Sequence, residues 1–563
     1  MLNSSTPYFV NKRDVVLRIN PKDSTSKNAV NHLILGDYIR YLGENNGDWI
    51  KVRSRNSTGW IKKVWVTPNR LLEINFVDIG QGDGCHIVTP GDEIILIDAG
   101  EGLGFDGRGA DNMVRFLSWR YNLRNRKVAG VDGVTKDTTG VKLPVDIDYA
   151  IISHPDLDHY YGFYNIFNNK KFKIKKVCHN GIVERSTKGV DKKTWMYDLG
   201  RKVPPIPEQK IYHLWDTVLT NSEMQNLIKK NMDSKKFYLK TLVASMRNNK
   251  DIYYQFVDAS QKYLDHFEGK NPLTIEILAP ITEEVEFNGT KKECLIKLGN
   301  EGQTKNGHSI VFKLHFGKLN ILLGGDLNTK SQDYIAQKYS GEKTTLSELE
   351  KMIHKLKEKL SGSIDLNIDK RKELKQELEE HIHLLNLIIS KTRRRFNVDI
   401  AKACHHGASD VLDSFLQAIN PIATIISSGD NETHSHPRPD ALGAFGKSSR
   451  GSRPLLFSTE LARSTNEFSY PVKFYALLKK LELLMNEATT KKDKEFYQLR
   501  MNRLRDSNVA KYGMITVRTD GEQVIIAQKL ERERSPGQKW DIYELYWNEK
   551  LGEFEYNPNR NSH

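Results

Sequence analysis

Five apolar stretches that each end in a polar residue or a glycine turn give the chain its dominant pattern. They lie at residues 72–78, 93–98, 150–153, 319–326 and 423–427. Short apolar runs bounded by turn residues are typical of buried strands. Layered α/β enzymes build their sites from polar residues at the carboxyl ends of such strands. The pattern therefore predicts an α/β fold whose site lies where these strands end.

Three stretches with helical patterns interrupt the strands. Residues from about 185 to 270 are polar and mostly helical in pattern, and a charged block at 340–397 begins with the capping box Thr345-x-x-Glu348. Within that block, apolar residues recur at helical spacing on two successive segments, which predicts a helical hairpin. A third helical insert is predicted at about 472–505. We expect these helices to pack on the body of the protein; the alternative is a surface for a partner.

The first 68 residues consist of short apolar or alternating runs between polar turns, which predicts a small β-barrel. Gly36-Asp37, the run from Trp49 to Val52 and the run from Gly59 to Ile61 resemble a bacterial SH3 domain. The resemblance implies a module that binds a peptide or a partner protein. The alternative is a domain that docks on its own enzyme.

A chain of 563 residues is too long for one compact core, so we expect several domains. The patterns predict four units. These are an SH3-like β-barrel at 1–68, the first part of the core at 69–339, the charged hairpin at 340–397, and the second part of the core at 398–563.

The composition is that of an ordinary globular protein with a basic excess. The net charge is +14, from 85 basic and 71 acidic residues, which favours acidic partners such as nucleic acid. Four cysteines without paired spacing exclude a disulfide framework or a cysteine zinc site. No stretch has the roughly 18 apolar residues that span a bilayer, and no signal peptide is evident. We therefore expect a cytoplasmic protein that does not associate with membranes.

The segment His154-x-Asp156-x-Asp158-His159 places four oxygen or nitrogen donors directly after a predicted buried strand. Carboxylates this close together repel one another unless a cation lies between them. Imidazole and carboxylate together suit zinc, manganese or iron. The segment therefore predicts a metal site.

This segment resembles the His-x-His-x-Asp-His signature of the metallo-β-lactamase superfamily, with Asp156 in place of the second histidine. With this variant, the chain is similar to the soluble hydrolase domain of the ComEC family of competence proteins. The matching motifs follow in order at residues 77–84, 96–100, 306–309, 324–326, 403–409 and 428–437. The resemblance implies a metallo-β-lactamase αββα sandwich with helical insertions, preceded by the small barrel.

The resemblance also implies two divalent metal ions, zinc or manganese, and assigns residues to them. One ion would be held by His154 and Asp156, the other by Asp158, His159 and one of His405 and His406, with Asp326 bridging the two. Such a pair of ions can hold a bridging hydroxide that attacks a phosphodiester. Asp158 would orient this hydroxide, and His436 would donate to the phosphate or the leaving group. The alternative for His436 is a loop histidine held by Pro437.

The motifs also suggest roles for four residues next to the proposed ligands. His308 stands where many superfamily members have a ligand, although competence-type members often lack it, and the alternative is a histidine at a strand edge. Losing one nitrogen ligand would leave an oxygen-rich site, which makes manganese a rival to zinc. Asp78, Asp83 and Asp98 are expected to brace the ligand loops rather than to touch substrate.

The resemblance implies a nuclease that hydrolyses DNA, either as an exonuclease or on single strands. Four basic residues, Lys391, Arg393, Arg394 and Arg395, are candidates for nucleic-acid contact; they could equally form a solvated helix face. One alternative is a small-molecule phosphodiesterase or ester hydrolase on the same fold. Another is a non-catalytic subunit that holds partners through the barrel or the hairpin. The architecture also suggests an effector of bacterial defence against viruses.

Overall fold

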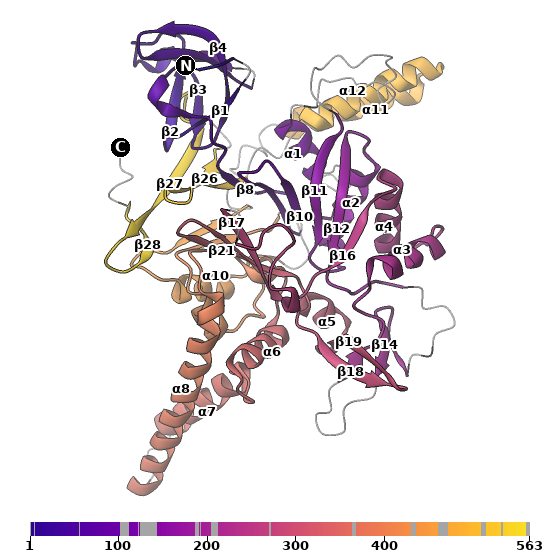
Figure 1. Ribbon diagram of the computed structural model, residues 1–563, viewed down its shortest axis with the longest axis vertical. Coiled ribbons are helices and arrows are strands. Elements are labelled where there is room, and N and C mark those ends of the chain that lie inside the picture. Colours follow the sequence, from indigo (N-terminus) through magenta and orange to yellow (C-terminus); the bar gives the residue numbers. More distant parts are fainter. Residues whose placement is uncertain are drawn as a thin grey trace.

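The computed structural model describes residues 2–558 apart from 5, 56, 81, 102–111, 122, 124–142, 186–190, 192, 204–211, 270–271, 363–366, 430–434, 460–470, 508–513 and 531–532. In this part of the chain it has four sheets and twelve α-helices, which confirms the mixed α/β class (Figure 1). No helix among these residues is long and apolar enough to cross a bilayer.

The larger of two central sheets has ten strands. The four strands at one end of this sheet, β10, β11, β12 and β16, run parallel, and the others pair antiparallel. In spatial order the strands are β16 (Tyr253–Phe256), β12 (Phe172–His179), β11 (Val145–Ile152), β10 (Ile94–Ala99), β9 (Gly84–Val88), β8 (Leu72–Phe76), β25 (Ile515–Thr519), β26 (Val524–Lys529), β27 (Trp540–Asn548) and β28 (Glu553–Tyr556).

The second central sheet has six strands, of which β21 to β24 are parallel. Its strands in spatial order are β17 (Leu273–Ala279), β20 (Val311–Phe316), β21 (Leu319–Leu323), β22 (Ile400–Lys402), β23 (Ala423–Ile426) and β24 (Leu455–Ser458). The two sheets share one apolar core, to which they contribute residues such as Ile74, Phe312 and Ile425. Each such buried side chain stabilises the fold by roughly 1.5–3 kcal/mol.

Helices cover the outer face of each central sheet. The ten-stranded sheet packs against α1 (Asn112–Arg120), α2 (Leu157–Asn168) and α4 (Phe237–Asn248), with α3 (Asn221–Lys230) beside them. The six-stranded sheet packs against α6 (Thr329–Ser340), α7 (Leu346–Gly362), α8 (Ile368–Phe396), α9 (Asp413–Ile419) and α10 (Pro439–Ser448). The order of layers is therefore helices, sheet, sheet, helices.

The N-terminal residues form an all-β unit of seven strands with its own core, which includes Leu17, Ile39 and Val52. Its strands in spatial order are β3 (Ala29–Ile34), β2 (Asp14–Arg18), β6 (Ser57–Lys62), β5 (Trp49–Ser54), β4 (Tyr38–Asn46), β1 (Pro7–Val10) and β7 (Val66–Thr67). Ile34 and Leu35 pack against Ile525 of the ten-stranded sheet. This unit therefore docks on the body of the protein; its SH3-like character stays a prediction.

The first predicted insert is not purely helical. Besides α3 and α4, residues 185–270 contribute β16 to the ten-stranded sheet and three short strands to a separate five-stranded sheet. That sheet has the order β13 (Trp195–Met196), β14 (Gly200–Val203), β15 (His213–Leu214), β19 (Thr290–Ile296) and β18 (Glu283–Phe287), and α5 (Glu301–Gly307) follows β19. The sequence pattern missed these strands because each is only two to four residues long and too short to show a period.

The other two inserts are helical hairpins (Figure 1). Helices α7 and α8 lie side by side, and Leu349 and Ile389 join them to the core under the six-stranded sheet. The third insert, predicted as helical at about 472–505, consists of two helices, α11 (Pro471–Glu487) and α12 (Lys491–Ser507). Leu478, Leu481 and Met501 form a small cluster between them.

A buried ion cluster on the ten-stranded sheet is expected to contribute strongly to stability. Glu73 accepts a hydrogen bond from Arg120 Nε at 2.9 Å and pairs with Arg518 at 3.1 Å, and all three side chains are largely buried. Changing Glu73 to Gln removes the counter-ion of Arg120 and leaves Arg518 only with Asp37 at 3.9 Å, so we predict a loss of about 3–5 kcal/mol in the free energy of unfolding, measured by chemical denaturation. The control E44Q breaks an exposed pair with Lys51 and should cost about 0–1 kcal/mol. Equal losses for the two variants would contradict this assignment.

Candidate metal centre

The candidate site lies at the carboxyl ends of parallel strands from both central sheets. Strand β11 ends at Ile152 and is followed by His154, and helix α2 then carries Asp158 and His159 in its first turn. From the other sheet, β21 is followed by Asp326 and β22 by a 3₁₀ turn that contains His405 and His406. Three strand ends and the first turn of α2 therefore bring their polar residues to one edge of the two-sheet core.

Three buried imidazoles are held at Nδ1 and present Nε2 to a common space. His159 Nδ1 lies 2.8 Å from Asp98 Oδ2, and His406 Nδ1 lies 3.0 Å from the carbonyl oxygen of Ser427. His154 Nδ1 lies 3.1 Å from the hydroxyl of Ser153. A hydrogen bond at Nδ1 fixes the ring and leaves Nε2 as the ligand atom, as in histidine metal sites.

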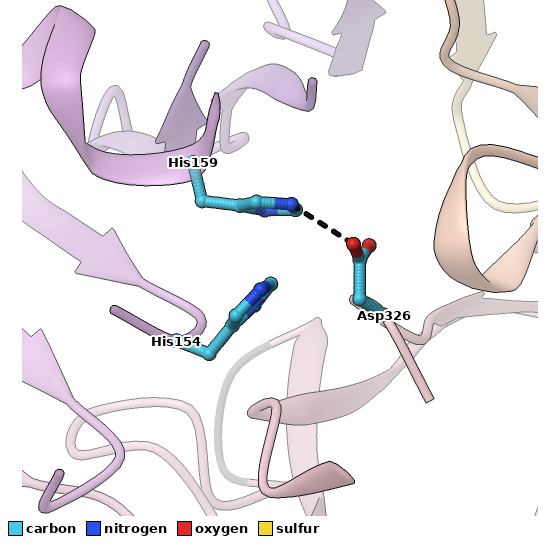
Figure 2. A group of neighbouring side chains, drawn as sticks. All are labelled: His154, His159 and Asp326. Carbon is cyan, nitrogen blue, oxygen red and sulfur yellow. Dashed lines mark hydrogen bonds and ion pairs between the residues drawn. The ribbon is translucent and has the colours of Figure 1, made fainter. Parts of the chain in front are cut away.

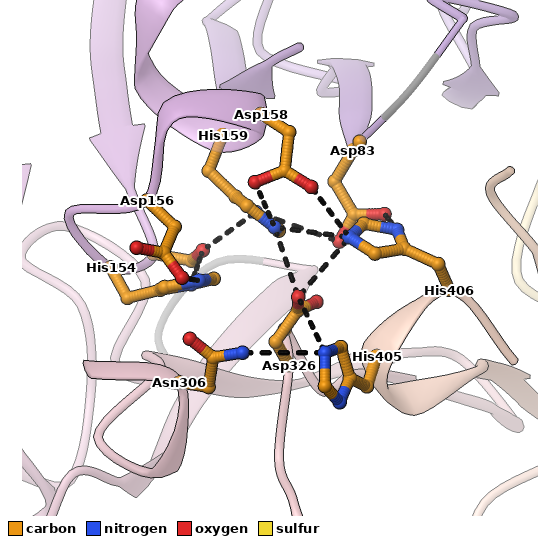
Figure 3. Close-up of polar contacts among 12 residues, drawn as sticks. Asp83, His154, Asp156, Asp158, His159, Asn306, Asp326, His405 and His406 are labelled. Atoms are coloured by element: carbon orange, nitrogen blue, oxygen red, sulfur yellow. Dashed lines mark hydrogen bonds and ion pairs between the residues drawn. The ribbon is translucent and has the colours of Figure 1, made fainter. Parts of the chain in front are cut away.

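The Nε2 atoms converge on Asp326, as Figures 2 and 3 show. Both His159 Nε2 and His406 Nε2 lie 3.1 Å from Asp326 Oδ2, and the two nitrogens are 3.2 Å apart. The carboxylate of Asp158 lies 3.4 Å from His406 Nε2 and 3.8 Å from His159 Nε2. Three donor atoms, from His159, His406 and Asp326, thus lie 3.1–3.2 Å from one another, and the carboxylate of Asp158 lies beside the two imidazoles.

These separations fit a metal ion. Ligands at about 2.0–2.1 Å from a tetrahedral zinc ion are about 3.3 Å from one another, close to the separations among His159, His406 and Asp326. His154 adds a second observation, because its Nε2 is fully buried and has no hydrogen-bond partner. A buried polar atom without a partner is costly. The donor set therefore suits a divalent cation.

The backbone at the histidine pair is strained. His405 and His406 have φ values of 49° and 53°, in the left-handed region that most residues avoid. Such strain persists only where surrounding structure enforces it, and it is concentrated at functional sites. Here it turns the two adjacent imidazoles in different directions, so that His406 enters the cluster.

Burial and the carboxylates compete in setting the charges of the site. Burial alone would lower the pKa of His159, but Asp326 and Asp98 raise it well above its ordinary value. The pKa of His406 is raised in the same way by Asp326, against the effect of burial. Burial opposes ionisation of Asp326, yet His159 and His406 hold its pKa well below the usual range. The charge of each group in the cluster therefore depends on the charges of the others, and a bound cation could replace the protons on the two imidazoles.

Lys402 is a part of the site that sequence analysis missed. Its buried ammonium pairs with Asp83 and donates to the carbonyl oxygen of Gly325 at 3.0 Å. Asp83, expected as a bracing residue, also lies 3.3 Å from His406 Nδ1 and within the cluster. A lysine at the end of an otherwise apolar strand was the available signal, since a buried lysine needs a counter-ion.

The other two bracing aspartates lie behind the ligands. Asp98 accepts from the backbone and hydroxyl of Ser153 at 2.8 and 2.6 Å, in addition to its contact with His159. Asp78 is fully buried and accepts from the backbone nitrogen of Gly80 at 3.3 Å. Asp98 thus ties the end of β10 to the loop after β11, and Asp78 fixes the turn of its own loop after β8.

His405 and His436 lie at the edge of the cluster. His405 Nδ1 pairs with Asp410 at 2.8 Å, and its Nε2 is 4.0 Å from Asp326. The ring centre of His436 lies 5.9 Å from that of His405 and 6.2 Å from that of His406. Of the pair His405-His406, His406 is thus the inner residue. Residues 430–434, which belong to the same predicted loop as His436, lie outside the described residues.

His308 does not join the donors. Its ring is buried at the carboxyl end of α5, and its Nε2 lies 2.7 Å from the carbonyl oxygen of Ile296. Burial lowers the pKa of His308 to about 4, so the ring is neutral and donates to that carbonyl. This corrects the assignment of His308 as a ligand: it holds α5 to β19.

The four basic residues at the end of α8 mostly contact their own chain. Lys391 pairs with Glu342 at 2.7 Å, Arg393 donates to the carbonyl oxygen of Gln417 at 2.7 Å, and Arg395 pairs with Glu276. Arg394 is exposed. Positive charge at the carboxyl end of a helix also complements the helix dipole. Their contact with nucleic acid stays a prediction.

Comparison with models of known protein families and with curated proteins found no match for this chain. The resemblance to metallo-β-lactamase and ComEC hydrolases therefore rests on the order of the motifs and the chemistry of the site.

We predict that Gly82→Ala weakens metal binding by at least about 10-fold, the loss that is typical when a residue that positions the ligands is changed. Gly82 has φ of +101°, and an added Cβ would lie 1.8 Å from the backbone oxygen of Asp158. An alanine at this position must therefore displace the first turn of α2, which carries the proposed ligands Asp158 and His159. Isothermal titration with Zn²⁺ measures the affinity. Gly341→Ala is the matched control, since it has a similar positive φ of +74° and open space around its Cβ. Equal affinities for the two variants would contradict the role of this contact.

We also predict that metal binding strengthens as pH rises. The raised pKa values of His159 and His406 mean that these rings carry protons near neutral pH in the metal-free protein. A metal must displace those protons, so affinity increases with pH and binding releases protons. Titration calorimetry between pH 6 and 8, in buffers of different ionisation enthalpy, measures the number released. Affinity that is constant over this range would be the contrary result.

Proposed function

We propose that the chain is a metal-dependent phosphodiesterase of the metallo-β-lactamase fold and that it acts as a nuclease on DNA. The observation that carries this proposal is the convergence of His159, His406, Asp326 and Asp158 at the carboxyl ends of strands from both sheets. The order of layers, with helices outside two sheets that share a core, supports the fold expected from the motifs.

The proposed ligands are Asp158, His159, Asp326 and His406, with His154 directed at the same space. When bound, divalent metal supplies Lewis acidity, which activates water and stabilises charge on phosphate oxygens. Asp98 and Ser427 hold the Nδ1 atoms of His159 and His406, so that the Nε2 atoms of the two rings face Asp326 as the ligand atoms. Lys402 offsets the charge of Asp83, so that two buried carboxylates stay ionised next to each other.

Two residues at the edge of the cluster are proposed to act on substrate. The side chain of Asp158 is 22% exposed, whereas that of Asp326 is 3% exposed. Asp158 is thus the carboxylate that can accept a proton from an attacking water. His436 lies beside His405 and His406. From this position its imidazole can donate a proton to a leaving oxygen.

DNA is proposed as the substrate because of the motifs and the net charge of +14. A basic protein that neutralises several phosphates binds more weakly as salt rises, because counterions are released on binding. A small phosphodiester carries too few charges to show a steep effect. The salt response therefore separates a nuclease from the alternative of a small-molecule phosphodiesterase.

We predict that Asp158→Asn and Asp326→Asn each lower cleavage of labelled linear DNA by more than about 100-fold. This exceeds the loss expected when a residue that only positions a ligand is changed. Single- and double-stranded substrates are digested in Mn²⁺ and in Zn²⁺, and products are followed on denaturing gels. Asp520→Asn, at an exposed turn on the ten-stranded sheet, is the control and should cleave like wild type.

Equal cleavage by all variants would overturn the site. Hydrolysis of a generic phosphodiester without cleavage of any nucleic acid would favour the small-molecule alternative. Metal binding without hydrolysis of either substrate would favour the non-catalytic subunit.

A further inference from the structure

The two ends of the donor cluster differ in how their carboxylates are used. Asp158 and Asp326 face the Nε2 atoms of His159 and His406 at the distances given above. Asp156, in contrast, faces a lysine: Nζ of Lys305 lies 2.6 Å from Asp156 Oδ1. Its other oxygen is 2.7 Å from the side-chain nitrogen of Asn306 when that amide is turned to face it. Both oxygens of Asp156 are thus engaged by donors of α5.

Lys305 is held firmly in this position. Its ammonium also pairs with Glu184 at 3.2 Å and with Glu301, one turn earlier on the same helix, at 3.9 Å. The side chain is only 12% exposed. The start of α5 is fixed by a capping box in which Asn300 and Gln303 bond to each other's backbone. Moving the ammonium away would leave three carboxylates without their counter-ion.

A metal ion bound by His154 and Asp156 would lie next to this ammonium. His154 Nε2 is 3.8 Å from Asp156 Oδ2, so an ion between them would share the carboxylate with Lys305. Two cations on one carboxylate repel each other, and the lysine is already paired. The conflict is weaker at Asp158, His159, Asp326 and His406, because Lys402 pairs there with Asp83 and lies 3.7 Å from the far oxygen of Asp326, against 2.6 Å between Lys305 and Asp156.

We propose that Lys305 is the fixed cation of the His154–Asp156 end and that the chain holds one tightly bound divalent ion, on Asp158, His159, Asp326 and His406. This inference rests on the proposed metal centre and narrows the expectation of two ions to one. Asp156 is then an ion-pair partner that anchors α5 to the loop after β11. Asp156 stands where the superfamily signature has a histidine. Together with Lys305 on α5 it forms an ion pair in place of a metal site.

The number of tightly bound ions tests the proposal. Purified protein is loaded with Mn²⁺ alone and passed through a desalting column. Retained metal is measured by inductively coupled plasma mass spectrometry, and calorimetry gives the number of tight sites. We expect one ion per chain in wild type, one in Lys305→Arg, which keeps the cation, and two in Lys305→Met, which frees Asp156 to join His154 and Asp326. Thermal unfolding of each variant verifies folding.

Asp156→Asn supplies a second variant in case Lys305→Met does not fold. Because Asp156 is not a ligand of the tight ion, this variant should retain one ion per chain. Two tight ions in wild type that fall to one in Asp156→Asn would overturn the inference and leave the proposed hydrolase intact. A single ion in folded Lys305→Met would overturn the role of Lys305. Wild type that retains no ion would overturn the metal centre and the proposed function with it.

Discussion

The meeting of His159 and His406 at Asp326 joins the two halves of the molecule. His159 follows β11 of the ten-stranded sheet, while Asp326 and His406 follow β21 and β22 of the six-stranded sheet. The separations of 3.1–3.2 Å exist only because the two sheets share one apolar core and end at the same edge. A small rotation of one sheet on the other would separate the donors, so the packing of the core sets the chemistry of the site.

Charge balance explains why so many ionisable groups can lie together in the interior. Isolated buried carboxylates are costly, and each one in this cluster has a defined partner. Asp98 faces His159, Asp83 faces Lys402, and Asp156 faces Lys305. The partners differ in kind, since an imidazole can take a metal on its other nitrogen whereas a lysine cannot. The pairing pattern thus divides the cluster into a histidine-rich end, which is the proposed metal site, and an ion-paired end.

Sequence reasoning reached those features that depend on local spacing. The buried strands, the helical hairpin at 340–397, the helical insert at about 472–505 and the donors between His154 and His159 could be predicted because alternation and periodicity are local properties of the chain. It could not reach features that depend on tertiary pairing. Lys402 and Lys305 gain their roles from Asp83 and Asp156, which lie far away in the sequence.

The short strands of the first insert were missed for a related reason, since a strand of two residues carries no period. His308 shows the opposite error. A histidine in a motif-like context was assigned to a metal, whereas a backbone carbonyl of β19 satisfies its ring nitrogen.

X-ray absorption spectroscopy of the zinc-loaded protein tests the central claim most directly, because it reports the atoms bound to the metal. We predict a shell of nitrogen and oxygen at about 2.0–2.1 Å, with the multiple scattering of imidazole from His159 and His406. Substituting His406 by Ala should reduce the imidazole contribution. A sulfur shell at about 2.3 Å, or a spectrum without imidazole scattering, would contradict the assignment.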